Sequence, residues 1–347
     1  MAKKQSKKLP FYCKKPFLWA AGSAVVFLLI VVLAFRLSPW PGALVVRWVF
    51  NHGGHKTLVG LQTSVSQQSV TVLANQHYGT GKKESLDVYI PPSAMQAHTT
   101  LPVVIWTHGG AWLSGDKTDS APYYGLLANQ GFIVIAVNYS LAPEATYPRP
   151  VQQLNEAYAY IKANATRFYA NTDKIVLAGD SAGAQLSSQM AVIITNPSYA
   201  QAMHIHPNLA PSQLSGVVLF CGIYKIEGLT QPNPTLPKIV SWGSDVSVWA
   251  YMGTRDKKSP LIQQASAYYQ ANKDFPPTFI SGGNGDTLTN AQSIPFAQKL
   301  NSLHVPVTSL FFPQDHTPSL PHEYQFTFDA DGKQAFTAMT QFLKELH

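Results

Sequence analysis

The chain divides into three stretches by its pattern of apolar and polar positions. Residues 17–35 are nineteen residues without a charge, which is long enough to cross a bilayer as one helix. Residues 39–50 then predict a short amphipathic helix beside the membrane. From residue 57 onward, short apolar runs alternate with segments of helical period, which is typical of a globular domain built on a sheet.

The apolar runs of the globular part predict a mostly parallel sheet. Residues 69–74 and 86–90 predict two antiparallel opening strands, and the continuous run at 101–107 is typical of a strand buried on both faces. Strands that alternate with helices favour a parallel sheet with right-handed crossovers. Further strands are expected at 132–138, 175–178, 216–221, 277–281 and 306–312, and helices at 120–130, 150–169, 185–194, 290–303 and 332–346. Residues 222–263 show no clean period.

One short motif links a predicted strand to a predicted helix. Residues 179–183 read Gly-Asp-Ser-Ala-Gly, a match to G-x-S-x-G. A sharp strand-to-helix turn would lift the Ser181 hydroxyl clear of the sheet, and the glycines permit the close backbone approach that such a turn needs. The N–H of Ala182 would then lie beside the reacting carbon. The motif predicts Ser181 as a nucleophile.

A second glycine motif follows the strand predicted at 101–107. Residues 108–112 read His-Gly-Gly-Ala-Trp, about 70 residues before the nucleophile. Acyl transfer passes through an oxyanion that needs N–H donors already aimed at it. We expect Gly109, Gly110 and Ala182 to supply these donors, and His108 to orient the loop rather than act as a base.

These motifs, together with Tyr-Ser-Leu-Ala-Pro-Glu at 139–144, resemble the hormone-sensitive-lipase-like branch of the α/β-hydrolases over about residues 60–347. The resemblance implies an α/β-hydrolase fold with helices flanking the sheet, carboxylesterase chemistry through a Ser-Asp-His triad, and no cofactor. It also implies a structural carboxylate at Asp180. This sequence has Ser140 where the branch usually has Arg, Gln153 where it often has an acid, and Ala111 in place of a third glycine.

The chain order Ser, acid, His then selects the remaining triad candidates. Asp286 follows the strand predicted at 277–281 through a glycine-rich loop, where the acid of this fold must lie. Two histidines, His316 and His322, follow the strand predicted at 306–312. We favour His322, because the aromatic residues after it could wedge its loop against the pocket. His316 stays open as the rival base.

Composition narrows the range of partners. The net charge of +7 comes from the head of the chain, because residues 1–15 hold six lysines and no acid, which leaves 19 basic against 18 acidic residues. A nucleic-acid-binding face is therefore not indicated. Cys13 and Cys221 lie on opposite sides of the apolar span, so a disulfide is not expected, and no metal-ligand spacing is found.

The excess of lysines before the apolar span also predicts how the chain is oriented in the membrane. Residues 1–16 should form a basic cytoplasmic tail, 17–35 a single transmembrane anchor and 36–60 a juxtamembrane segment. Residues 61–347 should form an extracytoplasmic hydrolase domain, with 222–263 as a possible cap over the pocket. The rival interpretation is a cleaved signal, which would make the protein secreted, although residues 33–36 are a poor cleavage site.

The functional hypothesis is a serine hydrolase acting on a small acyl ester through an acyl-enzyme. An acyltransferase or a peptidase with the same triad is the alternative, and a non-catalytic binding module is a more distant one. No cofactor, metal or nucleic acid is expected, and the oligomeric state is left open.

Overall fold

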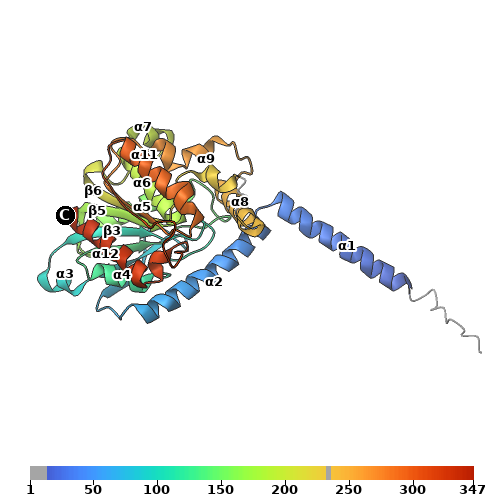
Figure 1. Ribbon diagram of the computed structural model, residues 1–347, viewed down its shortest axis with the longest axis horizontal. Helices are drawn as coiled ribbons and strands as arrows, with labels where there is room; N and C mark the ends of the chain where they lie inside the picture. The colour runs from blue at the N-terminus through green and yellow to red at the C-terminus, as the bar shows by residue number, and fades with distance from the viewer. Residues whose placement is uncertain (1–13, 232–235) are drawn as a thin grey trace, which may run out of the picture.

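A single eight-stranded sheet organises the protein (Figure 1). The computed structural model describes residues 14–231 and 236–347, so most of the lysine-rich head, Cys13 and residues 232–235 of the predicted cap lie outside the described residues. The strand order is β1-β2-β4-β3-β5-β6-β7-β8. The strands are β1 (Thr71–His77), β2 (Ser85–Ile90), β3 (Leu101–Thr107), β4 (Ile133–Val137), β5 (Ala170–Asp180), β6 (Leu214–Phe220), β7 (Thr278–Gly282) and β8 (Val307–Phe311).

Strand direction divides the sheet into a short antiparallel edge and a long parallel part. β1 pairs antiparallel with β2, and β2 pairs antiparallel with β4. All the remaining neighbours are parallel. The mostly parallel sheet and the antiparallel opening are therefore confirmed. Because the carboxyl ends of parallel strands meet at one edge, the loops after β3, β5, β7 and β8 are brought together there.

Helices cover both faces of the sheet. Three helices, α5 (Arg149–Ala163), α6 (Ala182–Thr195) and α11 (Ile294–Ser302), pack on the face that receives Val103 and Ile105 of β3. The other face, which receives Val104 and Trp106, is covered by α4 (Ala121–Ala128) and α12 (Ala330–Glu345). This alternation along β3 explains why its sequence is apolar throughout. The helices are α1 (Lys14–Leu37), α2 (Trp40–Ser64), α3 (Pro92–Ala97), α4 (Ala121–Ala128), α5 (Arg149–Ala163), α6 (Ala182–Thr195), α7 (Pro197–Ala202), α8 (Lys238–Met252), α9 (Pro260–Gln264), α10 (Ala267–Gln270), α11 (Ile294–Ser302) and α12 (Ala330–Glu345).

The helix expected at 150–169 ends at Ala163, and the strand expected at 175–178 begins at Ala170. Two further differences from the prediction lie in α2 and α8. The juxtamembrane helix does not end at residue 50, because α2 continues through Gly53 and Gly54 to Ser64. Adjacent glycines usually signal a helix end, but here they lie in a helix stabilised by packing against the domain, where Ala43, Val46 and Leu61 are buried. The segment without a clean period contains α8, whose buried residues gather near its C-terminal end.

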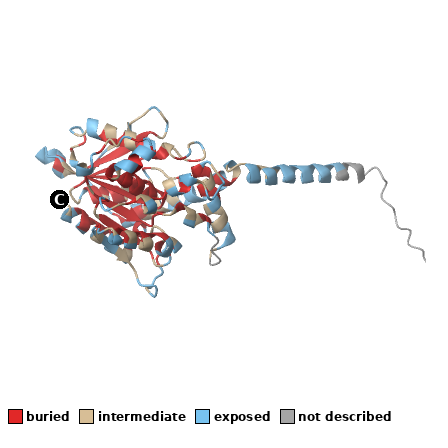
Figure 2. Ribbon diagram, turned by 90° about the horizontal axis from the view of Figure 1, so that it is seen from above, coloured by how far each residue is buried: buried red, intermediate tan, exposed pale blue. Residues whose placement is uncertain are grey.

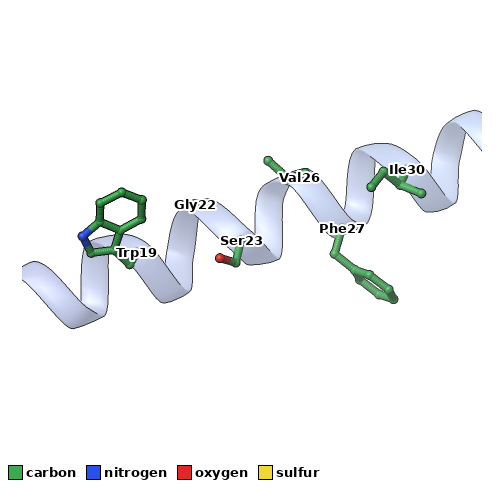
Figure 3. Close-up of a pocket in the computed structure, with 6 residues that line it drawn as sticks. All are labelled: Trp19, Gly22, Ser23, Val26, Phe27 and Ile30. Carbon is green, nitrogen blue, oxygen red and sulfur yellow. The ribbon is translucent and has the colours of Figure 1, made fainter.

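The first helix stands apart from the domain. Trp19–Leu37 is long and apolar enough to cross a membrane, and none of it is buried against the rest of the described chain. Figure 2 shows α1 projecting from the domain, with most of the helix that is coloured by burial exposed. Figure 3 shows its side chains at close range, with Trp19, Val26, Phe27 and Ile30 projecting away from the helix. Such a surface is unfavourable in water and suits a lipid environment.

Candidate active site

Ser181 lies at a tight turn between β5 and α6. Its backbone has φ 51° and ψ −120°, a conformation that is strained for a residue with a Cβ. A Cβ on Gly179 would lie 2.5 Å from the Gly183 carbonyl carbon, and a Cβ on Gly183 would lie 2.0 Å from the Thr107 oxygen. The two glycines of the motif are therefore required by close backbone contacts. The Ser181 N–H donates to the Phe220 carbonyl at 2.8 Å, which ties the turn to β6.

His322 connects Ser181 to Asp286. Its Nε2 lies 2.9 Å from Ser181 Oγ, and its Nδ1 lies 2.7 Å from Asp286 Oδ2. An ionised carboxylate can only accept, so Nδ1 carries the hydrogen and Nε2 is free to accept the Ser181 proton. Burial alone would lower the pKa of His322, but the Asp286 carboxylate raises it well above its ordinary value.

The loops that carry the acid and the base are bonded to each other. The Gly285 N–H donates to the Leu320 carbonyl at 2.9 Å, and the Leu320 N–H donates to Asn284 Oδ1 at 2.8 Å. Asp286 also accepts a hydrogen bond from the Leu288 N–H at 2.9 Å, which fixes its carboxylate. The two loops therefore form one rigid support for the pair.

The aromatic residues after His322 pack as the sequence suggested. Tyr324 and Phe326 are buried, and the Tyr324 hydroxyl lies 2.7 Å from Ser281 Oγ. The rival base has a different partner, because His316 Nε2 lies 3.1 Å from Asp331 Oδ2. The structure therefore brings His322, and not His316, into hydrogen-bonding contact with Ser181.

The loop after β3 corrects one predicted oxyanion donor. The Gly109 N–H donates to Asp180 Oδ2 at 2.7 Å, so this donor already has an acceptor in the Asp180 carboxyl group. Trp106 Nε1 donates to the other carboxylate oxygen at 2.7 Å. Asp180 is buried. Its burial is the main reason why its pKa lies well above the ordinary value, and the nearby Glu323 raises the pKa further. Asp180 is therefore a structural anchor for the loop, as the resemblance implied.

The turns after β3 and β5 also carry N–H groups that have no backbone acceptor among the described residues. Within the described chain, no backbone acceptor pairs with the N–H of Gly110, Ala111 or Ala182. Gly110 and Ala111 have φ values of 104° and 53°, so the loop turns sharply here. Gly110 and Ala182 belong to the predicted set, whereas Ala111 does not. The sequence-based expectation relied on glycines, whereas a peptide N–H is present whatever the side chain.

His108 holds the loop in place as a neutral ring. It stacks on Tyr139 with 4.5 Å between ring centroids, and its Nδ1 lies 2.8 Å from the Gly109 carbonyl oxygen. Burial lowers the pKa of His108 to about 4. The ring is therefore uncharged at neutral pH and orients the loop, in agreement with the sequence-based expectation.

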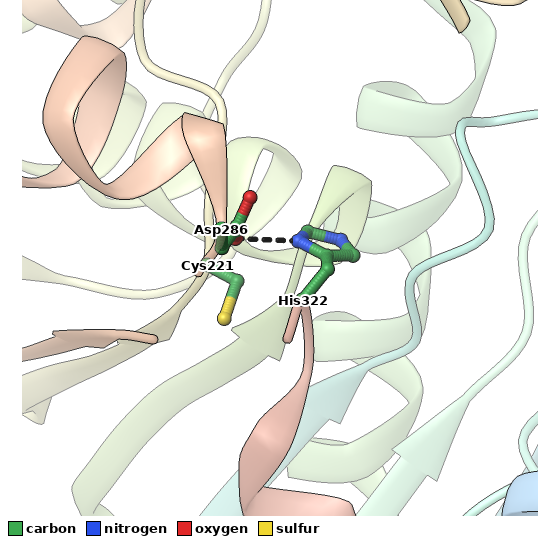
Figure 4. Close-up of side chains that lie close together, drawn as sticks. All are labelled: Cys221, Asp286 and His322. Atoms are coloured by element: carbon green, nitrogen blue, oxygen red, sulfur yellow. Dashed lines mark hydrogen bonds and ion pairs between the residues drawn. The ribbon is translucent and has the colours of Figure 1, made fainter. Parts of the chain in front are cut away.

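A thiol that the sequence did not single out lies beside the acid and the base (Figure 4). Cys221 follows β6, and its sulfur lies within 4.8 Å of ligand atoms of both Asp286 and His322. The Glu323 N–H points to this sulfur at 3.4 Å, and burial raises the pKa of the thiol. Since Asp286 and His322 already bond each other, the contacts describe an acid–base pair with a neutral thiol packed beneath it.

A side chain from α2 supports the Glu144 loop. Arg47 donates to Glu144 Oε1 at 2.7 Å, to the Ala142 carbonyl at 2.7 Å and to the Leu113 carbonyl at 2.6 Å. Leu113 belongs to the turn that follows Gly110. Arg47 therefore supplies from a distant helix the guanidinium that is missing at Ser140, and sequence reasoning missed it because it lies 97 positions from Glu144.

Gln153, which stands where the branch often has an acid, forms hydrogen bonds with nearby residues. Gln153 accepts from the Ser140 N–H at 2.8 Å and donates to Ser140 Oγ at 2.7 Å. It also donates to Glu84 Oε1 at 2.8 Å, and these contacts help to lower the pKa of Glu84 to about 2. A neutral pair, Ser140 and Gln153, thus occupies the place where the branch usually has an Arg and an acid.

A cavity of about 320 Å³ adjoins the loop after β3 (residues 108–115, called the oxyanion loop below), and α2 forms one wall of it. The wall from α2 consists of Val49, Phe50, Gly53, Gly54 and Thr57. The facing residues include Gly109, Gly110, Asp180 and Glu323. None of the described residues in 222–263 lines this cavity. Part of that segment packs nearby, because Tyr251 of α8 stacks on Trp112 with 4.6 Å between ring centroids.

Comparison with known proteins places this geometry in context. The family model described as BD-FAE matches residues 86–300. Two curated proteins of Mycobacterium tuberculosis (strain ATCC 25618 / H37Rv) are similar over 77% of this chain: "Probable carboxylic ester hydrolase LipM" at 27% identity and "Esterase LipQ" at 23%. The match covers 59% and 60% of their lengths, so the chain spans about three fifths of these relatives.

A solved structure agrees in fold. Esterase B from Lactobacillus rhamnosis superposes with a TM-score of 0.75 at 19% identity, covering 89% of this chain and 96% of that one. At this identity the similarity shows the fold alone. The α/β-hydrolase fold expected from the motifs is confirmed.

Proposed function

The chain belongs to the BD-FAE family, and on that premise we propose that it is a serine hydrolase that cleaves carboxylic esters. The observation that carries the proposal is the hydrogen-bonded series from Ser181 Oγ through His322 to Asp286, at 2.9 Å and 2.7 Å. Nucleophilic catalysis by serine needs a base in contact with the hydroxyl and a group that orients the base.

The proposed mechanism starts with proton transfer. His322 Nε2 takes the Ser181 proton as the serine oxygen attacks the ester carbonyl, and Asp286 stabilises the imidazolium that forms. His322 then gives this proton to the departing alcohol, which leaves an acyl-enzyme. Water attacks the acyl group by the same route, and the carboxylic acid product leaves with Ser181 restored.

We propose the N–H groups of Gly110, Ala111 and Ala182 as the oxyanion donors. They lack backbone acceptors within the described chain and lie on the turns that follow the adjacent strands β3 and β5. Gly109 is left out because its N–H donates to Asp180. Donors that are fixed before the reaction stabilise the developing charge without reorganisation.

The proposed location is a membrane, with α1 as a single-pass anchor. The six lysines that precede the apolar span favour a cytoplasmic N-terminus and a catalytic domain on the other side. The division into a tail at 1–16, an anchor at 17–35, a juxtamembrane segment at 36–60 and a hydrolase domain at 61–347 remains a proposal, as does a cap at 222–263. The contacts of α2 argue for counting it with the catalytic domain.

A panel of p-nitrophenyl esters tests the function. The full chain in detergent should hydrolyse at least one short ester, and Ser181→Ala should lose that activity. A fluorophosphonate should label the wild-type protein and not the variant. Equal turnover by the two proteins would refute the assignment. Faster product formation with added alcohols, giving the transferred ester, would identify an acyltransferase instead.

A further inference from the structure

The outer face of the first half of α2 is apolar and uncovered. Trp40, Leu44 and Trp48 recur every fourth residue, so they form one row along the helix. Their exposed fractions are 45%, 49% and 71%. The same turns bury Ala43 and Val46 on the opposite side. A helix with apolar residues on both its inner and its outer side is normally covered on both, but the described chain covers this one on the inner side only.

The row ends within the helix. Beyond Phe50 the exposed residues are mostly polar, as in His52, His55 and Lys56, and the exposed Val59 is isolated among them. Only the part of α2 nearest to α1 therefore carries a row of apolar side chains on its outer face. This change of polarity distinguishes a local contact surface from a general excess of exposed apolar residues.

The position of the row matches the edge of a membrane. The apolar span ends at Leu37, and Trp40 follows three residues later. From Trp40 to Trp48 the helix rises about 12 Å, whereas the headgroup region of one leaflet is about 5–8 Å thick. A helix that continued along α1 would carry Trp48 beyond this layer. Figure 1 shows instead that the chain changes direction after α1, so that α2 runs along the domain.

Two arginines lie where the apolar span ends. Arg36 lies in the last turn of α1, and Arg255 donates to its carbonyl oxygen at 2.9 Å. The Arg255 guanidinium also lies 4.7 Å from the ring centroid of Trp249. Arginine and tryptophan are favoured where the hydrocarbon meets the headgroups, because each joins an apolar body to a polar tip.

The other side of the same helix reaches the proposed catalytic machinery. Phe50 and Gly53 line the cavity beside Gly110, and Arg47 bonds the Leu113 carbonyl in the oxyanion loop. Any surface that binds the outer row of α2 would therefore also fix the position of the cavity wall.

We propose that residues 40–50 lie in the headgroup layer of the bilayer that α1 crosses, with Trp40, Leu44 and Trp48 inserted, so that the site takes acyl esters carried in that bilayer. The inference rests on the proposed membrane span and, for its substrate, on the proposed esterase function. A lipid surface is favoured over a second copy of the chain because the row begins three residues after the span ends.

Depth-dependent fluorescence quenching tests the position of the helix without using activity. The full chain is reconstituted in phospholipid nanodiscs whose acyl chains are brominated either near the headgroup or near the terminal methyl. The difference between wild type and Trp40→Phe/Trp48→Phe isolates the emission of the two tryptophans. We expect stronger quenching by bromine near the headgroup. Equal emission with and without bromine would overturn the proposal.

A comparison of two substrates tests the consequence for catalysis. In Trp40→Gln/Leu44→Gln/Trp48→Gln, hydrolysis of a long-chain fluorogenic ester embedded in the nanodisc should fall about tenfold. Hydrolysis of water-soluble p-nitrophenyl acetate should stay within about twofold, since these side chains are exposed. The matched control, His55→Gln/Lys56→Gln/Val59→Gln, changes three exposed residues in the second half of the same helix and should leave both rates unchanged. His52 is kept in this control because its ring stacks on Trp48.

The two readouts separate the possible failures. If no ester is cleaved by any variant but quenching is strongest near the headgroup, the proposed function fails and the membrane contact stands. If both triple variants cleave both esters like the wild type, the proposed delivery from the bilayer is overturned. If the row instead joins two copies, quenching will be absent and the apolar triple variant will change from dimer to monomer by mass photometry, which also overturns the proposal.

Discussion

The turn at Ser181 and helix α2 both contact the oxyanion loop, but they are held by different forces. The turn is fixed by backbone contacts, such as the Ser181 N–H to Phe220 carbonyl bond at 2.8 Å, and nothing larger than glycine fits at Gly179 or Gly183. Helix α2 is held by side chains, chiefly the Arg47 guanidinium and a few buried apolar residues. The chemistry is thus built into the sheet, whereas the wall beside it rests on contacts that single substitutions can remove.

The largest effect should come from the base. His322→Ala removes the group that accepts the Ser181 proton, and we expect kcat/KM for a short ester to fall about 10⁵–10⁶-fold. His316→Ala is the matched control, because His316 bonds Asp331 instead, and it should stay within about threefold of wild type. A large loss in His316→Ala with little loss in His322→Ala would reverse the assignment.

Asp286→Asn should reduce kcat about 10⁴-fold, since the amide no longer fixes the productive imidazole tautomer. The pH profile gives a second test of Asp286.

The Asp286 carboxylate raises the pKa of His322, and only the neutral ring can accept a proton. Wild-type activity should therefore be lost as the pH falls through this raised pKa. Without the carboxylate the pKa of His322 falls, so the acid limb of the residual activity should move to lower pH. A limb that moves to higher pH would contradict this pairing.

Arg47→Ala tests helix α2, which is held to the domain by side chains. Loss of its contacts to Glu144, Ala142 and Leu113 should loosen the oxyanion loop and lower kcat about tenfold, with about 1–2 kcal/mol less stability because the pair is partly exposed. Lys56→Ala removes an exposed cation from the same helix and should have no effect. If Arg47→Ala matched Lys56→Ala in turnover and melting temperature, α2 would have no part in fixing the loop.

The smallest effect on turnover should come from the pair that replaces the usual Arg and acid. Gln153→Ala leaves the half-buried Ser140 N–H without its acceptor and removes one donor from Glu84, which keeps its bonds to Arg149 and to the Gly81 N–H. We expect about 1–2 kcal/mol less stability with kcat within about threefold. Its exposed neighbour provides the control, since Gln152→Ala should melt like the wild type. Thermal unfolding measures both. An unchanged melting temperature in Gln153→Ala would show that these hydrogen bonds add nothing to stability.

Features that are fixed by local backbone contacts could be predicted from the sequence. β3 was predicted at its observed bounds, because a strand buried on both faces leaves a continuous apolar run. The geometry at Ser181 could be expected from its glycines, because the backbone contacts that require them are local. His322 could be favoured over His316 only through the aromatic residues that follow it.

Long-range side-chain contacts left no comparable signal. Arg47 acts on Glu144 across 97 positions, and nothing in a single sequence records such a pair. The Gly109 donor was misassigned because a glycine pair predicts free N–H groups but not the buried Asp180 carboxylate that engages one of them. α2 was predicted too short because propensity penalises Gly53 and Gly54, whereas tertiary packing stabilises the helix through them.

The reach of Arg47 has a practical consequence for fragments of this protein. Its one guanidinium contacts a carboxylate and two carbonyl groups, in Leu113 and Ala142, that lie in separate loops. A truncation that begins at residue 61 would discard this side chain together with the α2 wall of the cavity. The smallest fragment suited to crystallisation or screening should therefore start near Ser38, immediately after the apolar span, and retain all of α2.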